Sequence, residues 1–357
     1  MSKIEELIQK LCPNGVEYRE INSLCTVVSN RYKIPRSQYL EKGKYPIIDQ
    51  GKDFISGFSN KEEVVLPLKE YVLFGDHTRE VKYVSFPFVQ GADGLKILES
   101  SKGVIPRYFY HCLKNLNIPN RGYNRHWSIV SPIEIPFPPV EIQEEIVRIL
   151  DKFTSLSEKL NAELELRKKQ YEYYRERLIS STKKYELIKL GELCKIQRGV
   201  RVVKKQLEES GEYPVYQNSL EPLGFYDKSN YPANTSFIIC GGAAGSIGFS
   251  NVEFWAADDC FCFVSSDNLN DKYLFYVLKA NQIYFDSRVR KAGVPRLSRN
   301  SIENFEMALP SLAEQERIVS ILDKFDTLVN DQEKGLPAEI RKVQQQYEYY
   351  RDKLLTF

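Results

Sequence analysis

Two loops that combine glycine with several arginines carry the residue types best suited to a chemical task. The first reads RGYNRH over 121–126, and the second reads RVRKAGVPRLSR over 288–299. Arginine binds phosphate and reads guanine through paired hydrogen bonds, whereas asparagine reads adenine. The same number of residues separates a glycine from an arginine in both loops, which makes Arg125 and Arg296 equivalent positions. We favour DNA binding over a merely solvated loop because the pattern occurs twice.

The predicted DNA contacts fall into three groups. The two loops contribute Arg121, Tyr123, Asn124, Arg125, Arg288, Arg290, Lys291, Arg296 and Arg299. A second group comes from a basic stretch and the two amides after it, with one residue from the sparser matching stretch in the first half. It contains Arg198, Arg201, Lys204, Lys205, Gln217 and Asn218, and Arg36 from the first half. The third group is His77, Thr78, Arg79 and Lys82. For the basic stretch, a solvated hairpin is an alternative that the sequence leaves open.

Motifs for catalysis or cofactor binding are incomplete in this chain. Cys260 and Cys262 form a CxC pair without the further cysteines or histidines of a zinc site. The segment GGAAGSIG at 241–248 lacks the following Lys-Ser/Thr of a phosphate-binding loop, so we predict a tight turn between strands. PFPP at 136–139 superficially resembles the Asn/Asp-Pro-Pro-aromatic motif of amino-methyltransferases but lacks its first residue, and we interpret it as the start of a helix. We predict a non-catalytic chain with no metal or cofactor of its own.

An internal repeat sets the elements that must position these loops. PPVEIQEEIVRILDKF at 138–153 recurs as PSLAEQERIVSILDKF at 310–325, and QYEYYRERL at 170–178 recurs as QYEYYRDKL at 346–354. Fainter matches between the preceding segments keep the same order along the chain. The period is far longer than the roughly 20–50 residues of solenoid repeats, so we infer a duplicated domain.

The repeated motifs lie on two long amphipathic segments. Apolar residues recur there every three or four positions, which predicts helices of about 40 residues and about 60 Å that pair as an antiparallel coiled coil. The second segment carries four extra residues around Gly335 and Pro337, so we expect a kink or break at that point. The tyrosines predicted to dock a partner protein are Tyr171, Tyr174, Tyr347 and Tyr350; packing between the two helices is the alternative.

The globular halves are predicted to be α+β, with mainly antiparallel sheets and helices at 106–115 and 271–282. The expected domains are an N-terminal segment with the first globular domain at 1–140, a helix at 141–182, a second globular domain at 183–311 and a second helix at 312–357.

These helix motifs, together with GLPAEI at 335–340, resemble the specificity subunit of type I restriction-modification systems over essentially the whole chain. The resemblance implies two target recognition domains, each reading one half of a split DNA site, with a pseudo-twofold duplication. It also implies that the helices act as a ruler and as a platform for two methyltransferase subunits, which bind S-adenosylmethionine. Restriction subunits join some such complexes, and the sequence leaves their presence here open. Base-contacting residues vary within the family, so the DNA contacts above rest on the loops alone.

Location and alternative functions complete the expectations. No apolar run approaches the ~18 residues of a membrane span, and the N-terminal segment does not resemble a secretory signal, so we expect a cytoplasmic protein without membrane contact. A coiled-coil scaffold that binds only proteins is the principal alternative. A self-contained methyltransferase is the other.

Overall fold

The computed structural model describes residues 3–30, 32–91, 94–122 and 124–357. Its contacts divide the chain into two compact units. The first unit comprises Met1–Leu160 with Ile340–Phe357, and the second comprises Asn161–Glu339. The boundaries fall inside long helices, so each unit takes part of its core from a helix that continues beyond it.

Each unit is built around a four-stranded antiparallel sheet. In the first unit the strand order is β2 (Cys25–Val27), β9 (Leu95–Ser100), β6 (Tyr71–Gly75) and β7 (Val81–Val84). All five residues of β6 are buried because both of its faces are covered. Val72 and Phe74 belong to the core on the side of helix α3 (Pro106–Asn115), whereas Tyr71 and Leu73 pack toward a second sheet. The alternation of side chains along a strand therefore gives this β-strand two apolar cores.

The second sheet of the first unit is mixed. Its order is β4 (Gly57–Ser59), β3 (Tyr45–Ile48), β8 (Phe88–Gln90) and β5 (Val65–Leu66), and only β3 and β8 run parallel. A separate antiparallel pair joins β1 (Tyr18–Glu20) to β10 (Glu134–Pro136). The short helices of this unit are α1 (Lys3–Leu11), α2 (Ile21–Leu24), η1 (Arg36–Gln38), η2 (Glu62–Val64) and α4 (Trp127–Val130).

The second unit repeats this arrangement. Its main antiparallel sheet is β12 (Cys194–Arg198), β18 (Cys260–Ser265), β15 (Thr235–Ile239) and β16 (Ile247–Ser250). The second sheet is β14 (Gly224–Tyr226), β13 (Tyr213–Tyr216) and β17 (Trp255–Ala256), and the separate pair is β11 (Leu187–Lys189) with β19 (Glu306–Ala308). The helices are η3 (Thr182–Lys184), α6 (Leu190–Leu193), η4 (Lys204–Gln206), α7 (Asp271–Ala280), α8 (Gln282–Asp286) and α9 (Arg299–Glu303). The predicted duplication and α+β class are confirmed.

Two of the sequence interpretations concern short segments, and both are confirmed. The glycine-rich segment 241–248 forms the turn between β15 and β16 and the start of β16. The expected helices at 106–115 and 271–282 are α3 and α7.

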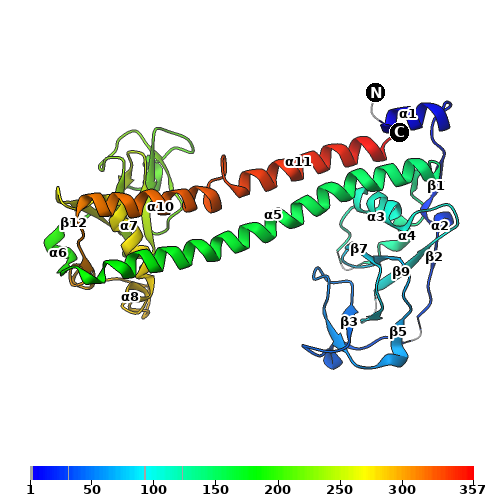
Figure 1. The fold of residues 1–357 in the computed structure, drawn as a ribbon, viewed down its shortest axis with the longest axis horizontal. Helices are drawn as coiled ribbons and strands as arrows, with labels where there is room; N and C mark the ends of the chain where they lie inside the picture. Colours follow the sequence, from blue (N-terminus) through cyan, green and yellow to red (C-terminus); the bar gives the residue numbers. More distant parts are fainter. Residues whose placement is uncertain (1–2, 31, 92–93, 123) are drawn as a thin grey trace. The chain divides into compact units, whose positions relative to one another are not determined.

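Long helices carry the repeated motifs. α5 spans Val140–Ser181 without interruption, whereas the second segment forms α10 (Leu312–Asn330) and α11 (Leu336–Leu355) (Figure 1). The predicted break is confirmed. Asp331 stabilises it by accepting hydrogen bonds from the backbone N–H groups of Glu333 and Lys334. A Cβ atom at Gly335 would lie 2.3 Å from the carbonyl oxygen of Thr327, so only glycine fits this turn.

Aromatic rings join the helices within each unit. In the first unit Phe153 of α5 stacks on Tyr350 of α11 with ring centroids 5.4 Å apart. In the second unit Tyr171 and Tyr174 of α5 stack on Phe325 of α10 at 6.3 and 5.4 Å. The C-terminal part of α5 thus pairs with the earlier helix α10 and its N-terminal part with the later helix α11, which is an antiparallel order. Supercoiled packing between them stays a prediction.

The tyrosine assignment needs one correction. Tyr171 is only 8% exposed and its hydroxyl donates to Asp326 at 3.4 Å, so this side chain packs inside the unit and cannot dock a partner. The Tyr171 ring lies on the apolar face of α5, which packs against α10, so the pairing of these helices buries it. Tyr173 and Tyr349, which belong to the same tyrosine clusters but were not among the predicted interface residues, are 56% and 61% exposed.

A buried glutamine fixes the start of each long helix in the same way. Gln143 accepts from the Ile105 N–H at 2.9 Å and donates to the carbonyl oxygens of Gly103 and Pro138 at 2.9 and 2.8 Å. In the second unit Gln315 accepts from the Asn270 N–H at 2.8 Å and donates to two further carbonyl oxygens, those of Asn268 and Pro310, both at 2.9 Å. Both glutamines are 0% exposed. Each therefore ties the long helix to the loop that leads into α3 or α7.

The helices of the described residues include none that is long and apolar enough to cross a membrane. Within the same residues, no group of three or more His, Cys, Asp or Glu side chains is placed to hold a metal ion.

Candidate nucleic-acid interface

The loop that carries Arg296 is fixed by backbone pairing in the second unit. Arg290 and Arg296 exchange two backbone hydrogen bonds of 2.9 and 3.1 Å, which close the basic loop into a small hairpin. Arg296 also forms an isolated bridge with Gly241, in the turn after β15. The loop is thereby anchored at the end of the main sheet. Arg290 at the base of the hairpin and Lys291 directly after it are both exposed.

Arg296 forms an ion pair with Asp259, the residue that precedes β18. The side chain of Arg296 is 42% exposed and that of Asp259 is 19% exposed, so the carboxylate lies beneath a guanidinium that solvent can reach. The hydrogen bond that Arg296 donates to Asp259, together with the negative charge of Asp259, raises the pKa of the Arg296 guanidinium. Beside this pair, Arg198 donates from Nε to the carbonyl oxygen of Asp258 at 2.6 Å.

The turn after β15 brings a third strand end to the same place. The N–H of Ala243 donates to the carbonyl oxygen of Asn218 at 2.9 Å, and the N–H of Gly242 donates to the carbonyl oxygen of Pro295 at 3.3 Å. Gly242 has a φ of +84° and a Cβ there would lie 2.8 Å from the Cβ of Asn218. The structure thus gathers Arg198, Asn218 and Arg296, three predicted contacts that are far apart in sequence.

The first unit places Arg125 at the equivalent position. The N–H of His126 donates to the carbonyl oxygen of Asp76, directly after β6, at 2.8 Å. The N–H of Leu297 donates in the same way to Cys240, directly after β15, at 3.0 Å. The residue before each donor is the arginine that glycine spacing had paired, so the structure supports the correspondence. Arg121, Asn124 and Arg125 are all exposed. Tyr123, also a predicted contact, lies outside the described residues.

His77 and Thr78 directly follow Asp76, which contacts this loop, and both bind Gln50. The backbone N–H of His77 donates to Oε1 of Gln50 at 3.1 Å, and the Thr78 hydroxyl donates to the Gln50 carbonyl oxygen. The Asp76 carboxylate accepts from the Trp127 N–H at 2.7 Å, which ties the turn after β6 to the segment that follows Arg125. His77 and Thr78 therefore lie near the first-unit loop, and DNA contact by them stays a prediction.

The prediction that Lys82 contacts DNA is wrong. Its side chain is buried, and its ammonium donates to the carbonyl oxygens of Asp49 and Asp53 at 2.9 and 2.5 Å. Burial lowers the pKa of Lys82, although the charge of Asp49 opposes that effect. Burial alone would raise the pKa of Asp49, but hydrogen bonds from Ser56 and Gly51 and the charge of Lys82 lower it below its usual value. Lys82 thus closes a loop of the first unit and is not available to phosphate.

Two arginines also depart from the prediction. Arg79 is half-buried and donates from Nη1 to the carbonyl oxygen of Ile118 at 2.9 Å, so it ties the β6–β7 turn to the loop after α3. Its φ of +66° lies in the left-handed region that side chains rarely adopt. Arg299 pairs with Glu303 at 2.7 Å and lines a hollow with Lys195, at the opposite end of β12 from Arg198. It does not join the group around Arg296.

The remaining predicted contacts are exposed but separate. The guanidinium of Arg288 lies over the Tyr284 ring, 3.4 Å from its centroid, which fixes the side chain beside α8. Arg201, Lys204 and Lys205 are exposed at η4 and just before it, and Gln217 is half-buried next to Asn218. Arg36 is exposed at η1 in the first unit, near enough to Asp49 to lower its pKa. The solvated-hairpin alternative for the residues around η4 stays open.

Two polar residues near the loops escaped the sequence analysis. Asp259 directly follows Ala257-Asp258, which matches Ala92-Asp93 in the first half. Gln50 follows segment 44–48, which matches segment 212–216, and this makes Gln50 equivalent to Asn218. The sequence analysis named neither Asp259 nor Gln50, although extending each match by one or two residues finds both.

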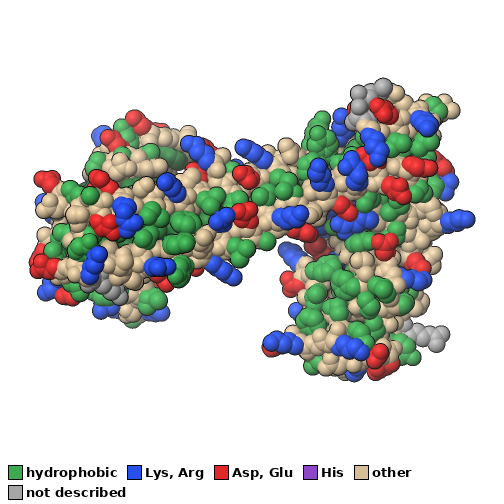
Figure 2. All heavy atoms as spheres, in the orientation of Figure 1, with side chains coloured by type: hydrophobic (Ala, Val, Ile, Leu, Met, Phe, Trp, Pro, Cys, Tyr) green, Lys and Arg blue, Asp and Glu red, His purple; other side chains and the backbone are tan. Residues whose placement is uncertain are grey.

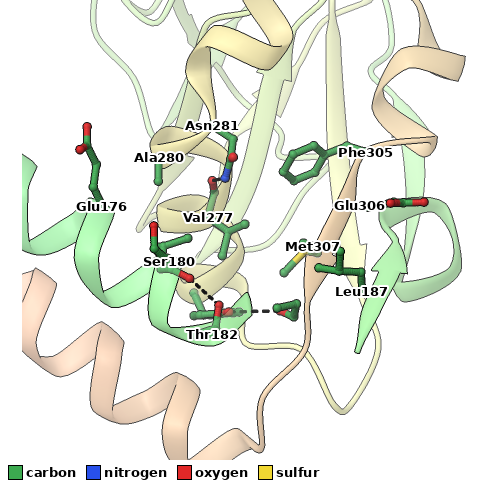
Figure 3. A pocket seen from close by; sticks show the side chains of 13 residues that line it. Glu176, Ser180, Thr182, Leu187, Val277, Ala280, Asn281, Phe305, Glu306 and Met307 are labelled. Carbon is green, nitrogen blue, oxygen red and sulfur yellow. Dashed lines mark hydrogen bonds between the residues drawn. The ribbon is translucent and has the colours of Figure 1, made fainter. Parts of the chain in front are cut away.

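Surface charge and cavities add no competing site. On the face that Figure 2 shows, Lys and Arg side chains are interspersed with acidic and hydrophobic ones, so the DNA assignment rests on particular loops. A cavity of about 280 Å³ lies between α5, α7 and β19 in the second unit (Figure 3). Its lining includes Val277, Phe305 and Met307 but none of the predicted DNA contacts. The Thr182 hydroxyl at its edge donates to the Ile179 carbonyl oxygen at 2.6 Å, an interaction that caps α5.

Comparisons with known proteins agree with this duplicated architecture. The family model for the type I restriction modification DNA specificity domain matches twice, over residues 13–166 and 182–342. The chain is 31% identical over 368 residues to the EcoR124I/EcoR124II type I restriction enzyme specificity subunit of Escherichia coli, covering 92% of this chain and 90% of that one. It is 29% identical over 396 residues to a putative type I restriction enzyme specificity subunit of Haemophilus influenzae, covering 100% of both.

The fold comparison points the same way. The crystal structure of a type I restriction-modification S subunit from M. genitalium matches with a TM-score of 0.71 at 18% identity, over 96% of this chain and 97% of that one. Family models that cover both halves, together with a relative above 30% identity along nearly its whole length, show the family. The chain belongs to the type I restriction-modification DNA specificity subunits.

Proposed function

We propose that this chain recognises a bipartite DNA target, with each unit reading one half of the site. The observation that carries the proposal is that each unit has an exposed arginine in a loop whose backbone is hydrogen-bonded to the residue directly after β6 or β15. Phosphate contacts position a protein on DNA, and a few side chains at base edges specify the sequence. Two equivalent loops on two copies of one scaffold suit two separate half-sites.

The long helices serve as the spacer in this proposal. α5 belongs to both units and continues unbroken for 42 residues, so it is the element that joins the two readers. An unbroken helix has a defined length per residue, which favours a constant number of unread base pairs between the half-sites.

Two methyltransferase subunits are the proposed partners, and S-adenosylmethionine belongs to them. Tyr173 on α5 and Tyr349 on α11 are exposed aromatic side chains, the kind enriched at protein interfaces. These exposed tyrosines also suit the alternative of a scaffold that binds only proteins. A mobility-shift assay with the assembled complex separates the two functions, because a scaffold without DNA readout gives no sequence-dependent shift.

Methylome sequencing tests the proposal directly. A host that carries this gene with its methyltransferase partner should show methylated adenine in a split motif with a constant spacer, and the same host without the gene should not. A single contiguous motif would contradict the two-reader model. Binding of the complex to its target should weaken steeply with salt, because phosphate contacts release counterions.

A further inference from the structure

The space around Gly241 in the second unit is filled by an ion pair rather than by a side chain of the turn. A Cβ atom at Gly241 would lie 2.5 Å from Nη1 of Arg296 and 2.5 Å from Oδ1 of Asp259. A side chain at residue 241 would therefore displace the pair from this position. The backbone and the two charged groups are therefore fitted to each other.

Backbone hydrogen bonds hold both partners of the pair. The N–H of Cys240 donates to the carbonyl oxygen of Asp259 at 2.7 Å, and the N–H of Leu297 donates to the carbonyl oxygen of Cys240 at 3.0 Å. Asp259 and the residue after Arg296 thus both bind Cys240, directly after β15. This shared backbone anchor brings the carboxylate and the guanidinium together.

The free edge of Arg296 has the geometry that base reading needs. Asp259 engages Nη1, and within the described part of the chain no hydrogen bond occupies Nε or Nη2. These two groups form the second donor edge of the guanidinium fork, and the side chain is 42% exposed. A planar fork held on one edge presents two parallel N–H donors on the other, the arrangement that matches O6 and N7 of guanine.

We infer that Asp259 is a positioning residue that orients Arg296 to read a guanine in the half-site bound by the second unit. The inference rests on the proposed function and adds to it a base identity and a residue that never touches DNA. Fixing the guanidinium removes orientations in which it would contact a phosphate instead. The Asp259 carboxylate also repels the phosphate backbone, so the pair favours specificity over affinity.

The experiment uses the complex assembled with its methyltransferase partner and the motif found for the unaltered protein. Duplexes with single base-pair changes at each position of both half-sites are compared in competition binding, and Arg296→Ala identifies the position that Arg296 reads. That position should be a G·C pair. Asp259→Asn keeps the size of the side chain and removes its charge, and it should reduce discrimination at that position by about tenfold while binding to unrelated DNA stays level or strengthens.

Asp258→Asn is the matched control, because it makes the same charge change at the neighbouring residue, which contacts Arg198 through its backbone carbonyl. It should leave discrimination unchanged. Asp259→Glu retains a carboxylate and should recover part of the discrimination, which a purely structural role of Asp259 does not predict. Thermal unfolding of each variant separates misfolding from misreading. If Asp259→Asn misfolds, the competition binding is carried out with Asp259→Glu instead. Discrimination by Asp259→Glu as weak as that of Arg296→Ala would then overturn the inference.

Failure of the inference is distinct from failure of the proposed function. If the unaltered complex reads a split motif but Asp259→Asn discriminates at every position as well as before, or if Arg296 reads an A·T pair, the inference is wrong and the two-reader function stands. If the unaltered complex has no split motif, the proposed function itself is wrong.

Discussion

The two units build the same edge of the sheet from different chemistry. In both, the residue directly after β6 or β15 donates a backbone hydrogen bond of 2.7 Å: the Asp76 N–H donates to the carbonyl oxygen of Gly94, and the Cys240 N–H donates to that of Asp259. Asp259 and Gly94 are thus equivalent, yet Gly94 has a φ of +95° and no side chain. The first unit therefore has no carboxylate there to hold an arginine.

Gln50 fills the space that the ion pair occupies in the second unit. A Cβ at Gly94 would lie 2.5 Å from Nε2 of Gln50. A neutral amide in the first unit therefore takes the place of a charged pair in the second. Strand order and anchoring bonds are retained, while the side chains that meet at one strand end change.

The contacts between α3 or α7 and the long helices show the same contrast. In the first unit Arg107 and His111 of α3 contact Asp151 at 2.8 and 2.9 Å. In the second unit the Tyr276 hydroxyl donates to Asp323, and Lys272 lies 3.9 Å from the same carboxylate. The aspartate is constant, but only the first unit carries a histidine, which can change its charge near neutral pH.

The largest expected effect tests what the units share. Replacing Gln143 or Gln315 with alanine leaves one buried N–H group and two carbonyl groups without a hydrogen-bond partner. Each variant should therefore lose about 3 kcal/mol of unfolding free energy in urea denaturation. Gln345→Ala, at an exposed position on α11, is the control. A loss confined to one of the two buried positions would show that the two anchors are not energetically equivalent.

Arginine substitutions test where the units differ. Arg296→Ala should relax one half-site at a cost of about 2 kcal/mol in discrimination, because a fixed fork is lost. Arg125→Ala, without a carboxylate at the Gly94 position, should weaken binding by about 1 kcal/mol and leave the motif unchanged. Methylome sequencing and competition binding measure both. Equal relaxation of the two half-sites would remove the distinction between the units.

Mild acid should destabilise the first unit more than the second. Burial lowers the pKa of His111 below its ordinary value of 6.5, despite the hydrogen bond with Asp151. The unfolded chain then binds a proton more readily than the folded chain, so stability falls as the pH drops from about 6.5 through the folded pKa. The groups facing His111 are Asp151, Arg107, Tyr347 and Tyr110.

Urea unfolding at pH 7.5 and pH 5.5 measures this effect. His111→Tyr copies the residue found at Tyr276 and should lose less stability between the two pH values than the unaltered protein does. The same pH dependence in both proteins would assign the acid sensitivity to another group.

The smallest expected effect concerns the basic residues at η4. Lys204→Ala should lower the slope of log affinity against log salt by about one and leave the motif unchanged, if Lys204 contacts phosphate. Lys195→Ala is the matched control, because Lys195 is exposed at the other end of the main sheet from Arg198. An unchanged slope for Lys204→Ala favours the solvated hairpin.

Much of the scaffold could be predicted from local pattern. The spacing of apolar residues located α5 and the second helical segment, and the extra residues around Gly335 located its break. The repeated PPVEIQ and PSLAEQ motifs contain Gln143 and Gln315, but the sequence could not show that both are buried. The prediction for Lys82 was wrong for a related reason. The carbonyl groups that bind its ammonium come from residues about 30 positions earlier in the sequence, and nothing next to Lys82 in the sequence reveals them.

By itself, then, the sequence determined the duplication, the α+β class, the long helices and the equivalence of Arg125 and Arg296, because these depend on periodicity and on similarity between two segments. Only the tertiary structure decided which polar groups meet. Arg296 and Asp259 are 37 residues apart and join because both loops attach to Cys240 at the end of β15. Such pairs depend on strand register and on the room left by a glycine, neither of which is encoded in the residues that form the pair.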